Sequence, residues 1–366
     1  MASTVFLHIG LPKTGTTYLQ DVLWGQRDLV AAEGMLLPGA GHREHLWAAL
    51  EVMGRPVGRR HPDAPGAWRR LVDEVATHDG PAVITHEFLC GASVKQAAAA
   101  ITDLAPADVH VVVTARHALG MLTAGWQESV KNGGRKRLEE VAAQKPGKKA
   151  GEFSWRTWDL GGVLKRWGGH VPADHVHVLP VPGPGEPPDQ HWRNFASVLG
   201  LDPGRYALPE GATNTSLGVV QVELLRRIND HLGGFRTAAD RGVWIRGYLA
   251  EGHLVRQEGA KFGPAPAEVA DCRVRSERAV ARIREAGFHV VGDVETLLVP
   301  ADLPALGHPD EVTDDALLEA ATRLVADMLE DVRATRRELG GGGSDSGSGP
   351  SGRRSDGRRR GRRPGR

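Results

Sequence analysis

The sequence contains little cysteine and no long hydrophobic run. Only Cys90 and Cys272 occur among its 366 residues, which excludes a disulfide framework and leaves no closely spaced pair for a zinc or redox motif. The apolar run at residues 5–9 is too short for a signal-peptide core or a membrane span, and no basic residue precedes it. The chain is long enough to bury a substantial core, so we expect a cytoplasmic enzyme.

The chain also lacks a strong excess of charge of one sign outside its C-terminal tail. Residues 340–366 hold eight arginines and two aspartates, which gives the tail +6, and the net charge of +1 then leaves −5 for residues 1–339. A mildly acidic folded part does not favour specific nucleic-acid binding. The tail is mostly glycine, serine and arginine without an aliphatic residue, which predicts disorder.

Short runs rich in β-branched residues alternate with helical patterns along the first half of the chain. We expect buried parallel strands at residues 3–9, 82–85, 109–114 and 175–181. The helices expected around them span residues 16–33, 67–78, 93–104 and 160–169. Further helices are expected at residues 190–199, 219–232, 273–286 and 314–337. The alternation predicts an α/β, three-layer fold with a central, mainly parallel sheet and a helical C-terminal region.

A loop suited to a phosphate-like anion follows the first expected strand directly. It reads Leu11-Pro12-Lys13-Thr14-Gly15-Thr16-Thr17 and opens the next helix. In that position backbone N–H groups and the helix dipole favour an anion. Lys13 adds positive charge, and the threonine hydroxyls add hydrogen-bond donors. The alternative is a capped helix start with a solvated lysine.

The order of residues in this loop differs from that of a nucleoside-triphosphate loop. Gly10 and Gly15 occupy the glycine positions of Gly-x-x-x-x-Gly-Lys-Ser/Thr, but Thr16 stands where the lysine belongs. The lysine is instead Lys13, ahead of the second glycine. This difference argues against a kinase or a nucleotide hydrolase.

The arrangement Pro-Lys-Thr-Gly-Thr-Thr of residues 12–17 resembles the 5′-phosphosulfate loop of sulfotransferases, in particular bacterial ones that use 3′-phosphoadenosine 5′-phosphosulfate (PAPS). The resemblance implies a P-loop-like fold. It further implies that Lys13 neutralises charge on the bridging oxygen as the sulfuryl group leaves. Gly15, Thr16 and Thr17 would hold the 5′-phosphate, within a loop that also includes Pro12 and Thr14.

A second element is similar to the 3′-phosphate site of the same family. There, a strand ends in arginine and the following helix carries a serine eight residues later. Arg116 ends the run at residues 111–116 and fits, but the position eight residues on is Ala124; the neighbouring Thr123 carries the nearest hydroxyl. Arginine can bind a phosphate through two hydrogen bonds. The alternative for Arg116 is an ion pair at the edge of the sheet.

A general base is expected at the end of the strand at residues 82–85, where His86 and Glu87 follow. Members of the resembling family use histidine or glutamate in comparable places. We favour Glu87, because burial beside an anion would raise its proton affinity, and place His86 second. The alternatives are a packed histidine and a glutamate that begins a helix.

Two other segments contain candidate residues. His42 and His45 are three residues apart but have no third ligand nearby, so no metal site is predicted. The segment from Trp126 to Lys149 turns basic and rich in glycine. It is expected to form either a mobile lid, in which Trp126, Gln127 and Lys131 line the pocket, or a plain surface loop.

The sequence therefore predicts a PAPS-dependent sulfotransferase that acts on a hydroxyl or amine of a small-molecule, glycan or lipid acceptor. Two alternatives remain: a P-loop kinase or nucleotide hydrolase, and a noncatalytic nucleotide-binding relative. The expected organisation is a nucleotide-binding core at residues 1–235, a helical extension packed on it at 236–339, and the disordered tail at 340–366.

Overall fold

The structure is a computed structural model that describes residues 2–57, 61–145, 153–209 and 216–341. Contacts divide the chain into two units, residues 1–320 and 321–366. The predicted tail falls almost wholly outside the described residues. The sheet and the sites described below lie in the first unit.

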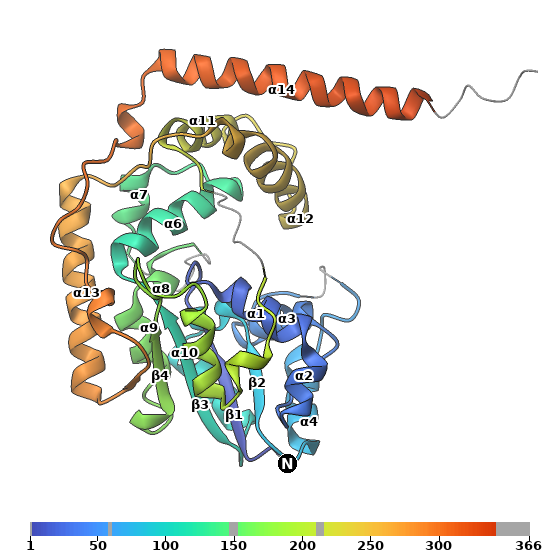
Figure 1. Ribbon diagram of the computed structural model, residues 1–366, viewed down its shortest axis with the longest axis vertical. Helices are drawn as coiled ribbons and strands as arrows, with labels where there is room; N and C mark the ends of the chain where they lie inside the picture. The colour runs from blue at the N-terminus through green and yellow to red at the C-terminus, as the bar shows by residue number, and fades with distance from the viewer. Residues whose placement is uncertain (1, 58–60, 146–152, 210–215, 342–366) are drawn as a thin grey trace, which may run out of the picture. The chain divides into compact units, whose positions relative to one another are not determined.

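Five strands form one parallel sheet (Figure 1). They are β1 (Thr4–His8), β2 (Ala82–Thr85), β3 (Asp108–Ala115), β4 (Val176–Pro180) and β5 (His289–Val290). Their order is β2-β1-β3-β4-β5. In such an open sheet the strand order reverses between β1 and β3, and ligands bind outside the carboxyl ends of the strands at this switch point.

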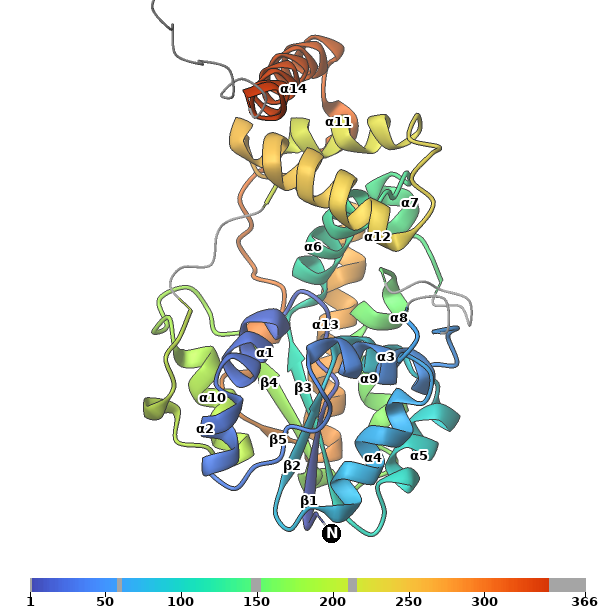
Figure 2. The same cartoon turned by 90° about the vertical axis from the view of Figure 1, so that its right-hand side faces the viewer.

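Helices cover both faces of the sheet (Figure 2). α1 (Thr16–Gly25), α2 (Arg27–Ala32) and α10 (Gln190–Leu199) lie on one face. The other face carries α4 (Ala67–Thr77), α5 (Val94–Asp103), α9 (Leu160–Trp167) and α13 (Pro266–Ala286). The predicted α/β, P-loop-like, three-layer architecture with a central parallel sheet is thereby confirmed.

The core on the α1 and α10 face shows why these segments form helices. Leu19, Val22 and Leu23 of α1 are spaced to lie on one side, and they pack with Trp192 and Phe195 of α10. The same cluster includes one side chain from each of the four longer strands: Phe6, Val83, Val112 and Leu179. Burial of this set fixes the start of α1, and with it the loop after β1, against the sheet.

Several predicted element bounds were wrong. The helix expected at residues 16–33 is two helices, because the backbone at Gln26 leaves the helical region (φ −131°, ψ 39°). The helix expected from residue 273 begins at Pro266, a residue suited to the first helical turn. The predicted lid does not begin at Trp126, because α6 (Ala118–Lys131) continues through it and buries both Trp126 and Lys131. Lys149 lies outside the described residues.

Further helical elements, most of them short, lie between and after those named above. Those near the sheet are α3 (His42–Val52), η1 (Glu87–Gly91), α7 (Leu138–Ala142), α8 (Trp155–Trp158), η2 (Ala173–His175) and η3 (Pro203–Arg205). The remainder are α11 (Val219–Asn229), α12 (Ala238–Asp240), η4 (Arg241–His253), η5 (Leu254–Gln257), η6 (Val294–Leu297), η7 (Pro309–Glu311) and α14 (Asp314–Gly341). The η4 segment is a π-helix, a form that often marks functional regions.

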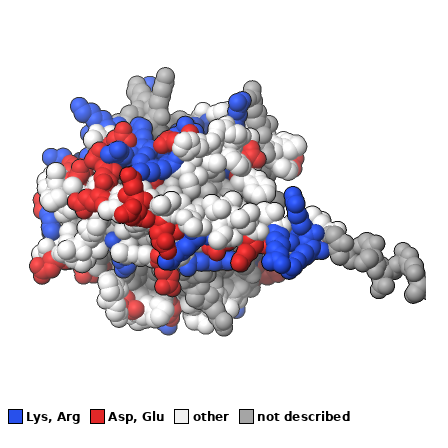
Figure 3. Space-filling model, turned by 90° about the horizontal axis from the view of Figure 1, so that it is seen from above, with Lys and Arg blue, Asp and Glu red and all other residues white. Residues whose placement is uncertain are grey.

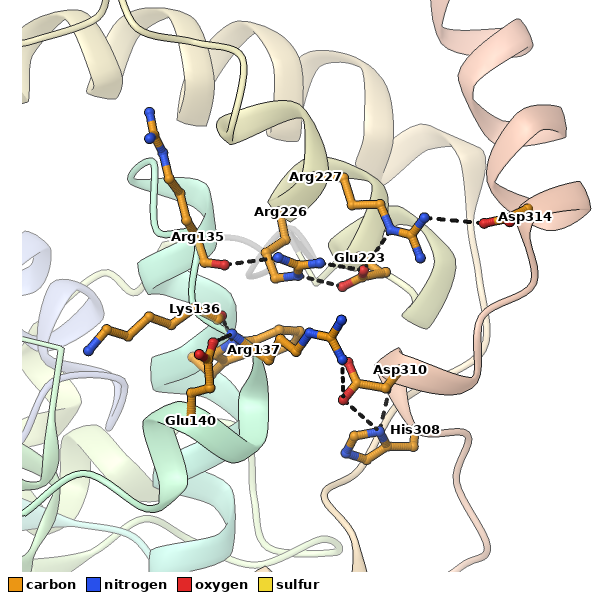
Figure 4. Close-up of polar contacts among 11 residues, drawn as sticks. Arg135, Lys136, Arg137, Glu140, Glu223, Arg226, Arg227, His308, Asp310 and Asp314 are labelled. Carbon is orange, nitrogen blue, oxygen red and sulfur yellow. Dashed lines mark hydrogen bonds and ion pairs between the residues drawn. The ribbon is translucent and has the colours of Figure 1, made fainter.

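A buried ion pair within α11 is hydrogen-bonded to the chain after α6 (Figure 4). Glu223 is almost fully buried and accepts two hydrogen bonds of 2.7 Å from the guanidinium of Arg226. Arg226 also donates to the carbonyl of Arg135, while Arg227 bridges Glu223 and Asp314. These contacts position α11 beside the C-terminal end of α6.

No helix among the described residues is long and apolar enough to cross a membrane. On the face in Figure 3, the described lysine and arginine side chains lie among aspartates and glutamates rather than in one basic patch.

Candidate active site

The loop after β1 adopts a conformation that needs glycine at a specific place. Gly10, Lys13 and Gly15 all have positive φ, at 56°, 66° and 80°. A Cβ atom on Gly10 would lie 2.8 Å from both Cβ of Glu87 and Cγ2 of Thr16, a separation that real side chains do not adopt. The missing side chain at Gly10 therefore allows Glu87 to pack directly on the loop.

The first backbone N–H groups of α1 have no side-chain cap. The N-cap residue of the helix is Gly15. Thr17 is exposed beside it, whereas Thr16 and Pro12 are buried. N–H groups without a side-chain cap at a helix start, together with an exposed hydroxyl, are donors that an anion at the carboxyl end of β1 would need.

Thr14 faces inward, unlike Thr17. Its hydroxyl donates to the carbonyl of Leu11 at 2.6 Å and lies 2.7 Å from the hydroxyl of Thr114 on β3. His8 lies below, 2.8 Å from the Thr85 hydroxyl, and burial is the main cause that lowers its pKa to about 3. These buried groups tie the loop to three strands and hold its shape.

His191 of α10 braces the loop from the opposite side. Its Nε2 donates to the carbonyl of Thr14 at 2.9 Å. A Cβ atom on Gly15 would lie 2.9 Å from the same nitrogen, so glycine is required for this close packing. Burial lowers the pKa of His191, opposed by that hydrogen bond, and the ring stays neutral at neutral pH.

Glu87 lies where a base is expected, but with a different proton affinity. Burial raises its pKa, yet His86, a backbone hydrogen bond and the Gln20 amide together outweigh burial and lower it. Gln20 donates to Glu87 at 3.2 Å and accepts from His42 at 2.9 Å. The carboxylate is thus ionised at neutral pH, contrary to the raised affinity expected from the sequence, and remains able to accept a proton.

His86 is less available than Glu87. It is almost fully buried, and its Nδ1 accepts a hydrogen bond from the backbone N–H of Phe88. Burial is the largest cause of its lowered pKa. Its ring lies 5.8 Å from that of His42 in a stacked arrangement.

Lys13 points across the crevice to α6. Its Nζ donates to Oε2 of Glu128 at 2.9 Å, and Arg246 of the π-helix η4 approaches the other carboxylate oxygen at 3.1 Å. Asn132 also donates to that oxygen at 3.0 Å. Burial raises the pKa of Glu128, but Lys13 and Arg246 outweigh it, and the net pKa is lowered. The buried carboxylate is therefore ionised and shared by two cations.

A cavity of about 880 Å³ runs along the same helix. One wall begins at Arg116, just before α6, and continues along that helix through Gly120, Thr123, Ala124 and Gln127. The opposite wall includes Lys261, Phe262 and Arg273. Three cationic side chains and no carboxylate are found among its described lining residues, so the cavity favours an anion.

Arg116 is the cation at the carboxyl end of β3. Its guanidinium lies over Gly120, where a Cβ atom would collide with Nε. No acidic partner contacts Arg116 among the described residues, so the predicted alternative of an ion pair is not observed there. Thr123 lines the cavity too, although its hydroxyl donates to the carbonyls of Leu119 and Gly120 at 3.1 and 3.4 Å.

The structure thus brings two groups of predicted residues to one end of the sheet. The loop from Pro12 to Thr17 and Glu87 meet at the carboxyl ends of β1 and β2, and Arg116 follows β3. Glu128, Arg246, Lys261 and Arg273 were not predicted. The only signal in the sequence was the glycine-flanked Lys261 in Gly259-Ala-Lys-Phe-Gly263, because the other three residues depend on helices packing far along the chain.

No protein-family model matches the chain, and no curated protein matches it. Among solved structures, the chain is similar to a sulfotransferase from Alicyclobacillus acidocaldarius, with a TM-score of 0.40 and 15% sequence identity. The match covers 64% of this chain and 98% of the other. A likeness of this strength carries no argument about function, which has to come from the geometry of the site.

Proposed function

We propose that the protein is a PAPS-dependent sulfotransferase that transfers the sulfuryl group to a hydroxyl or amine of a small-molecule, glycan or lipid acceptor, in the cytoplasm. The observation that supports this best is the pairing of two anion sites across the β1/β3 switch point. One is the Lys13 loop with its uncapped helix, and the other is the cavity headed by Arg116. A nucleotide with phosphates at both its 3′ and 5′ positions requires two such sites.

The residues fit the proposed donor in their charges. The 5′-phosphosulfate would bind the backbone of the loop, Lys13 and the hydroxyls of Thr16 and Thr17. The 3′-phosphate would bind Arg116, with Lys261 as a second cation in the same cavity. Thr123 is the nearest hydroxyl to the position of the family's serine, since Ala124 offers none.

The bound donor supplies an activated sulfuryl group. The chain's own residues then need only orient the acceptor and move one proton. Glu87, ionised and in contact with the loop, would accept the proton of the attacking hydroxyl or amine. Lys13 would balance the negative charge that develops on the departing oxygen. No metal is assigned to this site.

The rival reading is a P-loop kinase or hydrolase. That function calls for a lysine directly after Gly15, but Thr16 occupies the position in this sequence. A carboxylate such as Glu87 could bind magnesium in that case, so the two readings differ in their ligands and can be separated by binding.

A thermal-shift comparison tests the proposal. Adenosine 3′,5′-bisphosphate, the product of the donor, should stabilise the protein, by about 2.7 kcal/mol at a hundredfold excess over its dissociation constant. ATP with magnesium should do little. Lys13→Ala should remove most of the bisphosphate effect.

Stabilisation by ATP with magnesium but not by the bisphosphate would favour the kinase reading. Binding of the bisphosphate without turnover of PAPS against a panel of acceptors would favour a noncatalytic relative. If neither ligand binds, both enzyme hypotheses are rejected.

A further inference from the structure

A cluster of histidines lies at the opposite end of the sheet from the Lys13 loop. Asp108 begins β3, His110 follows on the same strand, and His175 ends η2 just before β4. One ligand atom from each of these three side chains lies within 4.8 Å of the others. Nothing in the proposed sulfuryl transfer uses these residues.

Two of the separations between ligand atoms are close to those found in a coordination sphere. His110 Nε2 lies 3.4 Å from one oxygen of Asp108, and His175 Nδ1 lies 3.0 Å from the other. Ligands bound at 2.0–2.2 Å around a tetrahedral zinc ion are about 3.3 Å apart. The observed distances bracket this value.

His175 Nδ1 is itself buried without a hydrogen-bond partner that has acceptable geometry. It faces the Asp108 carboxylate at 3.0 Å but is not aligned to donate to it. A cation between these two groups would satisfy both of them.

The surrounding histidines supply the support that a metal-bound imidazole needs. His110 Nδ1 lies 2.7 Å from His177 Nε2, and His177 Nδ1 lies 2.8 Å from His289 Nδ1. If each ring donates from Nδ1 toward β5, Nε2 of His110 keeps a free lone pair that faces Asp108. A histidine ligand usually donates its other N–H to a fixed acceptor in this manner.

From these observations we propose a zinc-binding site formed by Asp108, His110 and His175, with His177 and His289 as supporting residues. Carboxylate and imidazole ligands suit zinc among the divalent ions. The rings of His110 and His175 now stack within 11° of parallel, so both must tilt to direct their lone pairs at one ion. The bound ion would join β3 to the start of β4, and water would complete its coordination.

The experiment uses the full-length protein after chelator treatment, titrated with zinc chloride by calorimetry, with cobalt absorption as a spectroscopic readout. We expect one equivalent of zinc to bind, and the cobalt spectrum to show imidazole ligands. His175→Ala and Asp108→Asn should abolish binding of that equivalent, and His177→Phe should weaken it roughly 10- to 100-fold.

A matched control distinguishes zinc binding at this site from zinc binding to histidines elsewhere in the chain. The chain has sixteen histidines, and His231→Ala removes an exposed one while leaving the cluster intact. It should bind zinc as the unchanged protein does. The proposal fails if no equivalent binds, or if His231→Ala lowers binding as much as His175→Ala. Circular dichroism of each metal-free variant shows whether a loss of zinc binding comes from misfolding. If His175→Ala misfolds, Asp108→Asn, which keeps every histidine, provides the test.

Discussion

Lys13 Nζ and Glu128 Oε2 lie 2.9 Å apart, across a crevice that separates the loop after β1 from the C-terminal part of α6. Lys13 is the one side-chain cation of the loop, and Glu128 is nearly buried. An anion bound to the loop would have to share Lys13 with this carboxylate. The pair therefore links nucleotide affinity to a residue outside the loop.

Replacing Glu128 by glutamine should strengthen binding of adenosine 3′,5′-bisphosphate. The change removes a negative charge next to the site and keeps the shape of the side chain. A partly exposed ion pair contributes roughly 1 kcal/mol, or about fivefold in affinity. Calorimetric titration measures it. Glu139→Gln, an exposed neighbour on α7, should leave the affinity unchanged, and weaker binding by Glu128→Gln would show that Glu128 helps to hold the ligand.

Arg116→Ala should discriminate between two nucleotides. It should weaken adenosine 3′,5′-bisphosphate by roughly 10- to 100-fold, because hydrogen bonds to a charged group contribute about 1.5–3 kcal/mol. Adenosine 5′-phosphate, which lacks the 3′ group, should change little. Competition binding of both ligands gives the ratio.

The control for Arg116 is Arg69→Ala on α4, an exposed arginine paired with Asp73. It should bind both nucleotides as before. Equal losses for the two nucleotides in Arg116→Ala would remove Arg116 from the 3′-phosphate site.

Glu87→Gln should lower turnover without weakening nucleotide binding. Loss of a general base costs about 10²- to 10⁴-fold in rate, whereas the loop donors stay in place. The pKa of Glu87 is lowered, so the base is ionised throughout the neutral range and the rate should not fall until the pH drops below the ordinary carboxyl range. Steady-state kinetics against pH, with bisphosphate affinity measured in parallel, tests both statements.

His86→Gln serves as the comparison for that variant. If His86 is the base, its replacement should abolish turnover and Glu87→Gln should retain it. Both outcomes use the same assay, so the two candidates are separated directly.

Glu223→Gln should destabilise the fold by roughly 3 kcal/mol, because it leaves the buried Arg226 without its carboxylate. Urea denaturation measures the loss. Hydrogen bonds from Arg226 and Arg227 outweigh burial and lower the pKa of Glu223. Its contribution is therefore complete above the ordinary carboxyl pKa and disappears as the pH falls through the lowered one.

The difference between Glu223→Gln and the unchanged protein should accordingly be constant near neutral pH and close under acid conditions. Glu285→Gln on α13, exposed and remote, should show no such difference at any pH. A gap that widens in acid would contradict the assignment.

Local sequence was sufficient for the elements whose apolar spacing agrees with their burial. β1, β3 and β4 follow from it as continuous runs of buried residues, and the helices α1 and α10 follow because each buries one face. β5 has only two residues, which form a strand by pairing with the edge of β4. The break at Gln26 and the continuation of α6 through Trp126 were missed, since tertiary packing decides both.

The candidate site was predictable where a motif is continuous in the chain. The loop at residues 12–17 and the strand ends at Glu87 and Arg116 are of this kind. Glu128 and Arg246 are not, because their approach to Lys13 depends on how α6 and η4 pack. The lowered pKa of Glu87 also escaped prediction, since Gln20 reaches it from a helix 67 residues away in sequence.

The π-helical winding of η4 makes the number of residues in that segment chemically significant. Arg246 contacts Glu251, five positions later, at 3.1 Å while another of its nitrogens contacts Glu128, and five positions is the hydrogen-bond spacing of a π-helix. Loss of one residue from this stretch would change the register of its side chains and move the guanidinium away from Glu128. Insertions and deletions here would then retune the charge that Lys13 experiences, with every residue of the loop unaltered.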